Sequence, residues 1–373
     1  MKLKINRNLL LDNLNNVGRA LSNRNIIPVI NGILFELDSK GLSLTATDNE
    51  ITIKSFINKS DIKNIDSDGK CVIYGRFLLD ILRKLSSEEV EIEEVDGNKV
   101  IISTENGTYN LNCFDVNDFP NINMNTTGNA IKLTSGNFKE IVNQTVFATS
   151  TQESKPLLTG INLKITGNKL DSTATDSYRL AKKTVSFNDG FDQNINIVIP
   201  ARNINEFVKL LDDNDAIIEL YNNSNKIMFK YNNLLFQSSL LNGTYPNTDT
   251  LLPNDFETIY KINLNEFYSV LDRASILAQS KDKNIVSLET SGNILTITSF
   301  SSEIGKIEEK MNIEVVKGDD IKISFSVKYM MEALRSFNSE DVNIYFNGEI
   351  KPIIIKENDN GDLVQLILPI KTY

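Results

Sequence analysis

An internal repeat constrains the fold of this chain more than any other feature. The stretch "CVIYGRFLLDILRKL" at 71–85 returns as "IVIPARNINEFVKLL" at 197–211 and as "ISFSVKYMMEALRSF" at 323–337, at steps of 126 residues. Three such units account for the whole chain of 373 residues. A period of this length is that of a domain rather than that of a solenoid repeat. We therefore predict three tandem domains, at residues 1–127, 128–253 and 254–373.

Each unit predicts the same order of elements. A short strand, a polar cap and an amphipathic helix begin each unit. In the first unit Leu10, Leu14 and Val17 have the spacing of a buried helical face, and Asn6 is the expected N-cap. The three aligned stretches described above are expected as a second helix, and alternating strands with turn signals follow them. The fold class is therefore α+β, with helices on one face of antiparallel sheets.

The composition excludes several kinds of site. The chain has no histidine, so a histidine base, a Ser-His-Asp or Cys-His pair and a histidine metal ligand are all excluded. Cys71 and Cys113 are too few for a zinc cluster or a disulfide framework and are expected as reduced thiols. The chain has neither a P-loop nor a GxGxxG motif, so we expect no metal and no cofactor. It also shows no signal-like or membrane-length apolar stretch, which predicts a cytoplasmic protein outside the membrane.

The string "TATD" occurs at 45–48 and again at 173–176. Asp48 and Asp176 could serve a carboxylate-dependent hydrolase, but aspartate is a common turn former at the end of a strand. The third unit has "TITS" at this point, so we prefer a structural role for both aspartates. Only the second copy continues as "SYRL", at 177–180. These four residues could form a wall of a partner-binding pocket or part of the domain core, and the sequence leaves both possibilities open.

Cations recur at matching places although the chain has a net charge of −10. The two sets that align at 126-residue steps are Arg76, Arg202 and Lys328, and, seven residues later on the same helical face, Arg83, Lys209 and Arg335. Arg24 could join them. Cations are common on solvated helix faces, but this alignment favours a surface that faces an anion. Such a surface would suit the phosphates of DNA, held without sequence recognition. A protein-binding scaffold without a role in DNA binding is the alternative.

Several long stretches are specific enough to indicate a family. They are "SNRNIIPVINGILFEL" (22–37), "VFATSTQESKPLLTGINLK" (146–164), "TATDSYRLA" (173–181), "IVIPARN" (197–203), "LLNGTYPNT" (240–248), "FSVKYMMEAL" (325–334) and "VQLILPIKTY" (364–373). Through them the chain resembles the bacterial DNA polymerase III beta subunit family, the sliding clamps, of the low-GC Gram-positive and mollicute type.

The resemblance implies a homodimer in which two three-domain subunits close head to tail into a ring around double-stranded DNA. A clamp loader complex opens the ring. The ring then tethers the DNA polymerase III catalytic subunit and other proteins with a clamp-binding motif, which raises their effective concentration at the DNA. The clamp itself is not an enzyme.

The resemblance also implies site residues. The partner-peptide pocket would comprise Lys155, Leu158, Thr175, Ser177, Tyr178, Arg179, Leu180, Pro246, Leu251, Pro352, Leu366, Ile367, Leu368 and Ile370, with Lys155, Tyr178 and Arg179 at its rim. DNA contacts would come from Arg24, Arg76 and Gln152, to which the aligned cations add Arg202 and Lys328. The dimer interface would place Tyr109 and Leu111 of one subunit against Ile276 and Leu277 of the other.

The chain departs from the family pattern in three places. Many members have Gly-His where this chain has Ser177-Tyr178, and commonly Arg where it has Lys155. A lysine cannot make the bidentate contact of an arginine, so the peptide preference is expected to differ. Pro156 and Leu157 stand where some relatives have DNA-contacting tyrosines.

Overall fold

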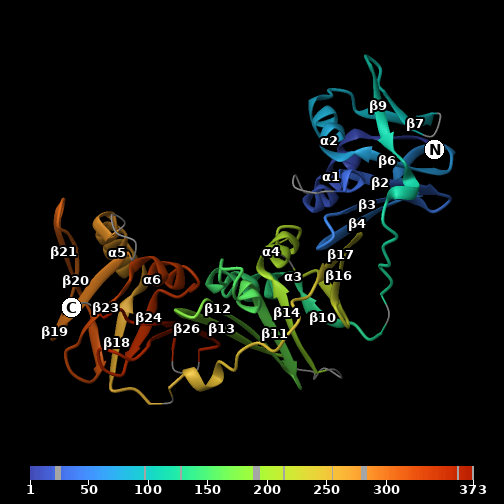
Figure 1. Ribbon diagram of the computed structural model, residues 1–373. Coiled ribbons are helices and arrows are strands. Elements are labelled where there is room, and N and C mark those ends of the chain that lie inside the picture. Colours follow the sequence, from blue (N-terminus) through green and yellow to red (C-terminus); the bar gives the residue numbers. More distant parts are fainter. Residues whose placement is uncertain are drawn as a thin grey trace. The chain divides into compact units, whose positions relative to one another are not determined.

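The computed structural model describes residues 1–21, 27–95, 98–126, 128–187, 194–212, 215–253, 255–278, 284–358 and 361–371. Antiparallel strands dominate it, and short helices pack on them (Figure 1). The chain divides into two compact units, which are Met1–Lys139 with Arg202–Leu240, and Glu140–Ala201 with Leu241–Tyr373. No helix within the described ranges is long and apolar enough to cross a membrane.

The three repeats share one order of helices and strands, except that the described part of the second has one strand fewer before its second helix. The first comprises β1 (Lys2–Asn6), α1 (Arg7–Val17), β2 (Gly32–Asp38), β3 (Gly41–Thr47), β4 (Ile51–Asn58), β5 (Ile62–Ser67), β6 (Gly69–Tyr74), α2 (Gly75–Lys84), β7 (Glu89–Val95), β8 (Lys99–Ser103) and β9 (Thr108–Phe114). The second comprises β10 (Ile131–Thr134), α3 (Ser135–Asn143), β11 (Gly160–Thr166), β12 (Lys169–Thr175), β13 (Arg179–Ser186), β14 (Ile195–Pro200), α4 (Ala201–Val208), β15 (Ile217–Asn223), β16 (Lys226–Tyr231) and β17 (Leu234–Ser239). The third comprises β18 (Thr258–Asn263), α5 (Leu264–Ala278), β19 (Ile285–Ser291), β20 (Ile294–Ser301), β21 (Gly305–Asn312), β22 (Glu314–Lys317), β23 (Lys322–Ser326), α6 (Val327–Leu334), β24 (Asp341–Phe346), β25 (Ile353–Lys356) and β26 (Leu363–Ile367).

Strand pairing continues from each repeat into the next. β4 pairs with β17, with Ile51 opposite Ser238, and β13 pairs with β26, with Arg179 opposite Ile367. In each repeat the three strands after the first helix pair in order. Both pairings join the last of these three strands to the last strand of the following repeat. The first and second repeats therefore share a 13-stranded sheet, and the second and third share a 9-stranded sheet.

Two strands lack such a partner in the part of the chain that the structure describes. β21, the counterpart of β4 and β13, pairs only with β20. β9, the counterpart of β17 and β26, pairs with β8 along its length but with β6 only at Cys113 and Phe114. The edge of β9 at 108–112 is therefore open. An open edge presents unpaired N–H and C=O groups to any further strand.

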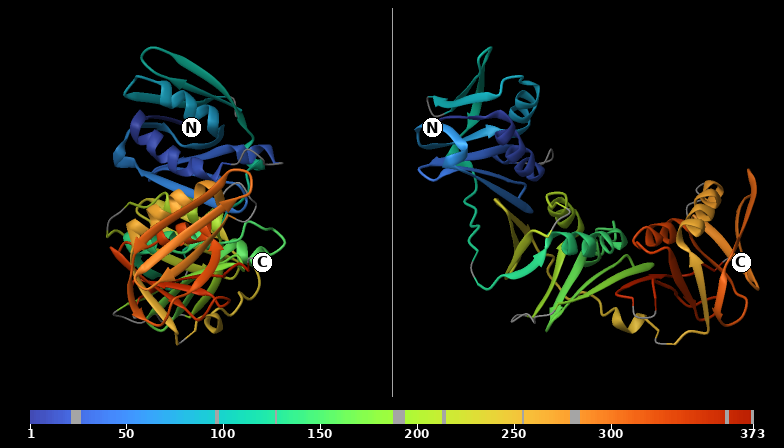
Figure 2. Two further views of the ribbon diagram at one scale, coloured as in Figure 1. Left: turned by 90° about the vertical axis from the view of Figure 1, so that its left-hand side faces the viewer. Right: turned by 180° about the vertical axis from the view of Figure 1, so that it is seen from behind.

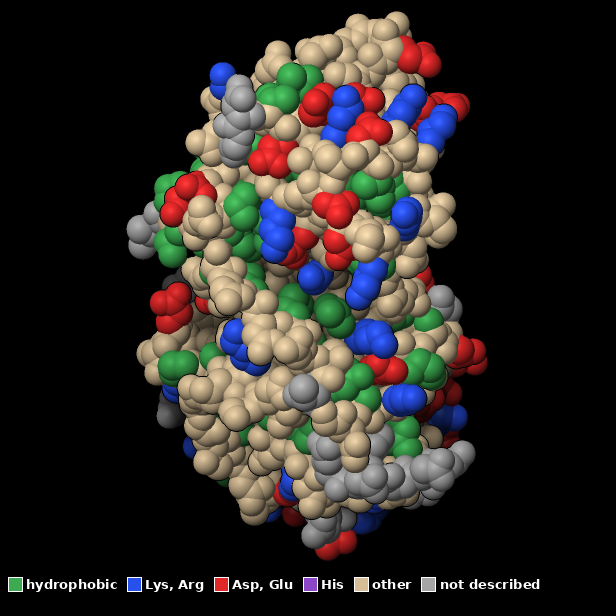
Figure 3. Space-filling view, turned by 90° about the vertical axis from the view of Figure 1, so that its right-hand side faces the viewer, with side chains coloured by type: hydrophobic (Ala, Val, Ile, Leu, Met, Phe, Trp, Pro, Cys, Tyr) green, Lys and Arg blue, Asp and Glu red, His purple; other side chains and the backbone are tan. Residues whose placement is uncertain are grey.

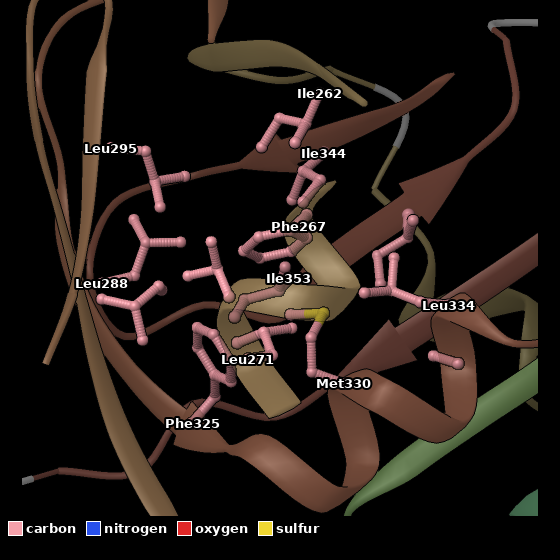
Figure 4. Close-up of a cluster of buried hydrophobic side chains, with 14 of the residues drawn as sticks. Ile262, Phe267, Leu271, Leu288, Leu295, Phe325, Met330, Leu334, Ile344 and Ile353 are labelled. Carbon is pink, nitrogen blue, oxygen red and sulfur yellow. The ribbon is translucent and has the colours of Figure 1, made fainter. Parts of the chain in front are cut away.

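The expected helical faces form the cores. Leu10, Leu14 and Val17 are fully buried, and Asn6 Oδ1 accepts hydrogen bonds from two N–H groups of the first turn of α1, at 2.9 and 3.1 Å. In the third repeat, Phe267 and Leu271 of α5 point into one cluster with Met330 of α6 and side chains of the strands (Figure 4). Figure 2 shows α5 lying against the strands β19 to β21. Each such buried side chain contributes about 1.5–3 kcal/mol of apolar burial.

The expectation of a second helix over 71–85, 197–211 and 323–337 was too long in every copy. The first residues of each stretch are the strands β6, β14 and β23, and only the remainder is helical. The residues "CVIY", "IVI" and "ISF" are mostly β-branched, apolar or aromatic, which suits a pleated surface. They also pair with β2, β11 and β19, so tertiary hydrogen bonds decide their state.

The two "TATD" strings form one corner built twice. Asp48 Oδ1 accepts from the N–H of Ile51 at 2.8 Å, and Asp176 Oδ1 accepts from the N–H of Arg179 at 3.1 Å. Each aspartate thereby caps the turn between two strands, so the structural role predicted for both is confirmed. The third repeat has Ser299 at this place.

The residue after each aspartate is left-handed. Asn49 has φ 76° and Ser177 has φ 80°. Asparagine tolerates this region because its short amide bonds locally, whereas serine does so less well. The two equivalent turns therefore differ in backbone strain.

Replacing Ser177 by glycine should raise the free energy of unfolding by about 0.5–1 kcal/mol. The left-handed region costs a non-glycine residue roughly 1–2 kcal/mol, and part of that gain is lost to the entropy of glycine in the unfolded chain. The measurement is denaturant unfolding. Asn49→Gly is the matched control and should change the stability less. A Ser177→Gly variant no more stable than the parent would contradict this account.

Candidate functional site

Arg179, which we expected at the rim of a partner pocket, is instead buried, with 8% of its surface exposed. Its Nε donates to Asp176 Oδ2 at 3.0 Å, its Nη2 donates to the carbonyl of Phe147 at 2.7 Å, and its Nη1 pairs with Glu332 of α6. The guanidinium also lies 4.4 Å from the ring centroid of Tyr329. A buried cation needs such partners, because an unpaired one costs several kcal/mol. Arg179 therefore ties β13 to α6, and each of its three nitrogens has a partner within the protein.

The equivalent junction between the first and second repeats also has an arginine at its corner. Arg202 of α4 donates from Nη2 to Asp48 Oδ2 at 2.7 Å, and its Nη1 lies 3.7 Å from a carboxylate oxygen of Glu50. Arg19, which follows α1, pairs with Glu206 of α4 at 3.4 Å. Two carboxylates thus pair with Arg202, whose side chain remains 59% exposed, and its predicted contact with DNA stays a prediction. The structure gives this residue a role in the junction.

A hollow of about 690 Å³ lies beside the Arg179 corner, within one compact unit. Three predicted pocket residues line it, namely Tyr178, Leu368 and Ile370. The rest of its lining comes from Asn284, Ser326, Lys328, Tyr329 and Pro369. Burial raises the pKa of the Tyr329 phenol, so this side chain stays a neutral hydroxyl at physiological pH. Aromatic and aliphatic walls with a few polar groups suit apolar side chains of a ligand.

Other predicted pocket residues lie in a neighbouring apolar cluster. Leu180 and Leu366 are opposite each other across β13 and β26, and they pack with Tyr345 and Ile354. Leu251 is exposed. Of "SYRL", Leu180 is therefore core, whereas Tyr178 lines the hollow, and its role in binding a partner stays a prediction.

The remaining predicted pocket residues occupy different places. Leu158 packs with Val198 and Tyr245, and the buried Thr175 donates its N–H to the Tyr245 hydroxyl at 3.1 Å. Pro246 lines a separate polar hollow of about 210 Å³. Ile367 belongs to the core of the third repeat, and Pro352 is half-buried.

Two of the departures from the family pattern contact each other. The Nζ of Lys155 donates to Ser177 Oγ at 3.2 Å, and both side chains are exposed. Tyr178, at the position of the usual histidine, is 58% exposed beside the hollow. The substituted residues therefore form a small polar edge of their own.

The aligned cations differ in how free they are. Arg76 and Lys328 are exposed and have no ion-pair partner among the described residues, and Gln152 is also exposed. In contrast, Arg83 Nη1 lies 3.5 Å from Asp80 Oδ1, and Lys209 Nζ lies 2.6 Å from Glu206 Oε1. The guanidinium of Arg335 contacts the ring of Tyr268. On the face in Figure 3, Lys and Arg side chains lie next to Asp and Glu side chains. Arg24 lies outside the described residues.

Two of the predicted interface residues lie on the open strand β9, and the other two lie on helix α5. On β9 Tyr109 is 36% exposed and Leu111 is half-buried. On α5 Ile276 is 66% exposed, whereas Leu277 is buried.

No cluster of three or more carboxylate or cysteine groups that could hold a metal occurs in the ranges that the structure describes. Asp48 and Asp176 are each engaged by two backbone N–H groups and one arginine. Neither carboxylate is placed to act on a substrate, so the geometry does not support the hydrolase alternative.

Comparison with known proteins covers the whole chain. Family models described as the N-terminal, central and C-terminal domains of the DNA polymerase III beta subunit match residues 1–123, 132–247 and 249–371. The beta sliding clamps of Bacillus subtilis and Staphylococcus epidermidis are 36% and 37% identical, over 100% of this chain and of each relative.

Solved structures agree with the sequence comparisons. The DNA polymerase sliding clamp from Bacillus subtilis superposes with a TM-score of 0.97 at 36% identity. The DNA polymerase III beta chain from Streptococcus pneumoniae superposes with a TM-score of 0.96 at 30% identity, and both matches cover 100% of both chains. The chain therefore belongs to the DNA polymerase III beta subunit family, and its function is that of a sliding clamp, the non-catalytic processivity factor of the polymerase.

Proposed function

We propose that two copies of this chain close into a ring by pairing β9 of each subunit with β21 of the other. The observation that carries this proposal is that the chain makes the same junction twice internally and leaves both halves of a third one open. Pairing the open halves head to tail completes the pattern and removes both edges. A heterologous interface of this kind gives a closed ring when the rotation closes.

The repeats predict the register of this pairing. In the last strand pair of the three repeats, the facing residues are Ile102 with Tyr109, Phe229 with Phe236, and Ile355 with Gln365. Two residues further along the last strand, Leu111 is therefore equivalent to Ser238 and Ile367. At the three corners, the facing residues are Thr47 with Thr52, Thr175 with Leu180, and Thr298 with Glu308. One residue earlier on the second strand of each pair, Ile307 is therefore equivalent to Ile51 and Arg179. Ser238 faces Ile51, and Ile367 faces Arg179. We therefore expect Leu111 opposite Ile307 of the partner subunit.

Burial at the two internal junctions shows what closure would cover. Phe236 and Gln365, the counterparts of Tyr109, are 0% and 1% exposed. On the helix side, Ile276 corresponds to Arg19, which pairs with Glu206 of the second repeat, and to Phe147, whose carbonyl accepts from Arg179. Closure would bury Tyr109 as Phe236 and Gln365 are buried, and would bring Ile276 into contact with the partner subunit.

Replacing Ile276 by aspartate should raise the dissociation constant of the dimer at least about 30-fold. A carboxylate in a desolvated interface costs 2 kcal/mol or more, as at other interface hot spots. Sedimentation equilibrium over a concentration series measures this change. The control is Ile350→Asp, at a residue that is 68% exposed in the turn between β24 and β25. Equal dimer affinity of the two variants would refute the interface.

The register has its own check. In a chain with Cys71→Ser and Cys113→Ser, Asn110→Cys with Glu308→Cys should crosslink two subunits under mild oxidation. Asn110→Cys with Lys310→Cys, shifted along the same strand face, should crosslink less. The reverse order would mean that the ring closes in another register.

We propose that the ring encloses duplex DNA and that Arg76, Lys328 and Gln152 contact its phosphates. Arg76 and Lys328 stand at the position of Arg202, but the acid that binds Arg202 is not available to them. At the second corner Asp176 is already bound to Arg179, and the third corner carries Ser299. Two free cations in an acidic chain suit phosphate contacts that allow sliding. Arg24 remains a prediction.

Removing Arg76 and Lys328 together, by Arg76→Ala and Lys328→Ala, should weaken the binding of duplex DNA and make it less salt-dependent. The slope of log K against log salt should fall by up to about 4 per ring, because each of the two subunits loses two phosphate contacts and each contact contributes about 1. Fluorescence anisotropy across a salt series measures the slope. The control removes two exposed lysines elsewhere, Lys40→Ala with Lys351→Ala. An equal fall in slope for the control would show that only net charge matters.

We also propose that the hollow beside the Arg179 corner receives a short apolar peptide from the polymerase catalytic subunit, the clamp loader and other partners. Tyr178, Tyr329 and Leu368 supply apolar walls, and strand β26 runs directly into this lining. Lys155 and Lys328 add positive charge nearby, which favours a peptide with an acidic residue beside its apolar ones.

Replacing Leu368 by aspartate should weaken the binding of such a peptide at least about 10-fold, because a carboxylate replaces an apolar contact in the hollow. Isothermal titration calorimetry with an unlabelled peptide from the polymerase measures the affinity. Ile350→Asp again serves as the control, and sedimentation should show that the ring of the Leu368→Asp variant persists. Unchanged affinity would place the peptide elsewhere.

A further inference from the structure

The only two cysteines of the chain lie side by side. Cys71 is on β6 and Cys113 is on β9, and these strands pair with Ile73 opposite Cys113. Side chains two residues apart on a strand share a face, so Cys71 and Cys113 are diagonal neighbours on one face of the sheet. Two cysteines that are 42 positions apart in the sequence are therefore adjacent through strand pairing alone.

The two thiols differ in their surroundings. Cys71 is buried whereas Cys113 is half-exposed. The interaction of the two thiols, with burial, raises the pKa of Cys71, and the same interaction lowers the pKa of Cys113. The nearby charged groups are the Glu94 carboxylate, which opposes a thiolate, and the Met1 ammonium, which pairs with Glu94 at 3.2 Å.

We propose that Cys71 and Cys113 are a reversible oxidation site, at which a hydroperoxide converts the two adjacent thiols into a disulfide between β6 and β9. The difference in burial between the two thiols indicates which one meets the oxidant and which one forms the disulfide with it. Cys113, which solvent reaches, meets the oxidant, and Cys71, which solvent does not reach, resolves the product. In reducing surroundings such a disulfide is transient and serves as a redox sensor rather than as a structural bond.

The chemistry balances in two steps. The Cys113 thiolate attacks the peroxide oxygen, forming an S–O bond and breaking the O–O bond, and the leaving oxygen takes a proton. The Cys71 thiol then loses its proton, and its sulfur attacks the sulfenic sulfur of Cys113, forming the S–S bond and releasing water. The cysteine pair has lost two electrons and the peroxide has gained them. A dithiol reductant reverses the change.

The position of the pair gives the oxidation a structural consequence. β9 and β6 pair only at Cys113 and Phe114, directly after the open edge of β9. A disulfide would fasten the end of β9 covalently to β6. The oxidation itself does not depend on ring closure, so it can be tested whether or not the proposed ring forms.

The test treats the intact full-length protein with hydrogen peroxide and maps its peptides by mass spectrometry without reduction. We expect one linked peptide pair containing Cys71 and Cys113, a loss of two hydrogen atoms per chain, and full recovery of both thiols with dithiothreitol. In the reduced protein, iodoacetamide should label Cys113 at least about 10-fold faster than Cys71, as expected from exposure and thiolate character.

Single variants make the assignment falsifiable. In Cys71→Ser, Cys113 should accumulate as sulfenic or sulfinic acid with no linked peptide. In Cys113→Ser, Cys71 should stay a thiol under the same treatment. Oxidation of Cys113 to a sulfinic acid in the parent protein while Cys71 remains free, or an equal rate of Cys71 oxidation in Cys113→Ser, would overturn the proposal.

Discussion

Strand pairing across the repeat boundaries is the constraint on which the rest of this structure depends. The backbone of an edge strand must find partners, and β4 and β13 find theirs in the following repeat. Because the sheet continues, Phe236 and Gln365 become fully buried, although each lies at the end of its own repeat. The last residues of one repeat thus acquire their environment from the preceding one. The same logic leaves β9 and β21 incomplete within the ranges that the structure describes.

The two aspartate corners show how a duplicated element diverged. Both aspartates cap their turn through Oδ1, which explains why "TATD" is kept in two repeats. Both also bind an arginine through Oδ2, but the arginines come from different places. Asp48 receives Arg202 from the following repeat, whereas Asp176 receives Arg179 from its own turn. Arg179 then reaches Glu332 of the following repeat, so both corners hold a junction by opposite routes.

This divergence also determines where a ligand can enter. With Arg179 enclosed, its neighbour Tyr178 is left exposed at the mouth of the hollow beside α6 and the end of β26. A corner that binds its arginine internally therefore leaves an apolar recess with few charges of its own. At the first corner the arginine comes from α4 of the following repeat instead. The third corner has a serine in place of the aspartate.

The sequence by itself determined the repeat, the fold class, the first helix of each repeat and the turn role of the aspartates, because these follow from spacing and local hydrogen bonding. Leu10, Leu14 and Val17 are buried as their periodicity predicts. Only the tertiary structure decided which halves of the second helical stretches are strands, since pairing with β2, β11 and β19 overrides local preference. It also decided that Arg179 and Arg202 serve junctions and that Tyr329 lines the hollow. Charge and position in a sequence do not say which carboxylate will be within reach, and that depends on contacts between residues more than 150 positions apart.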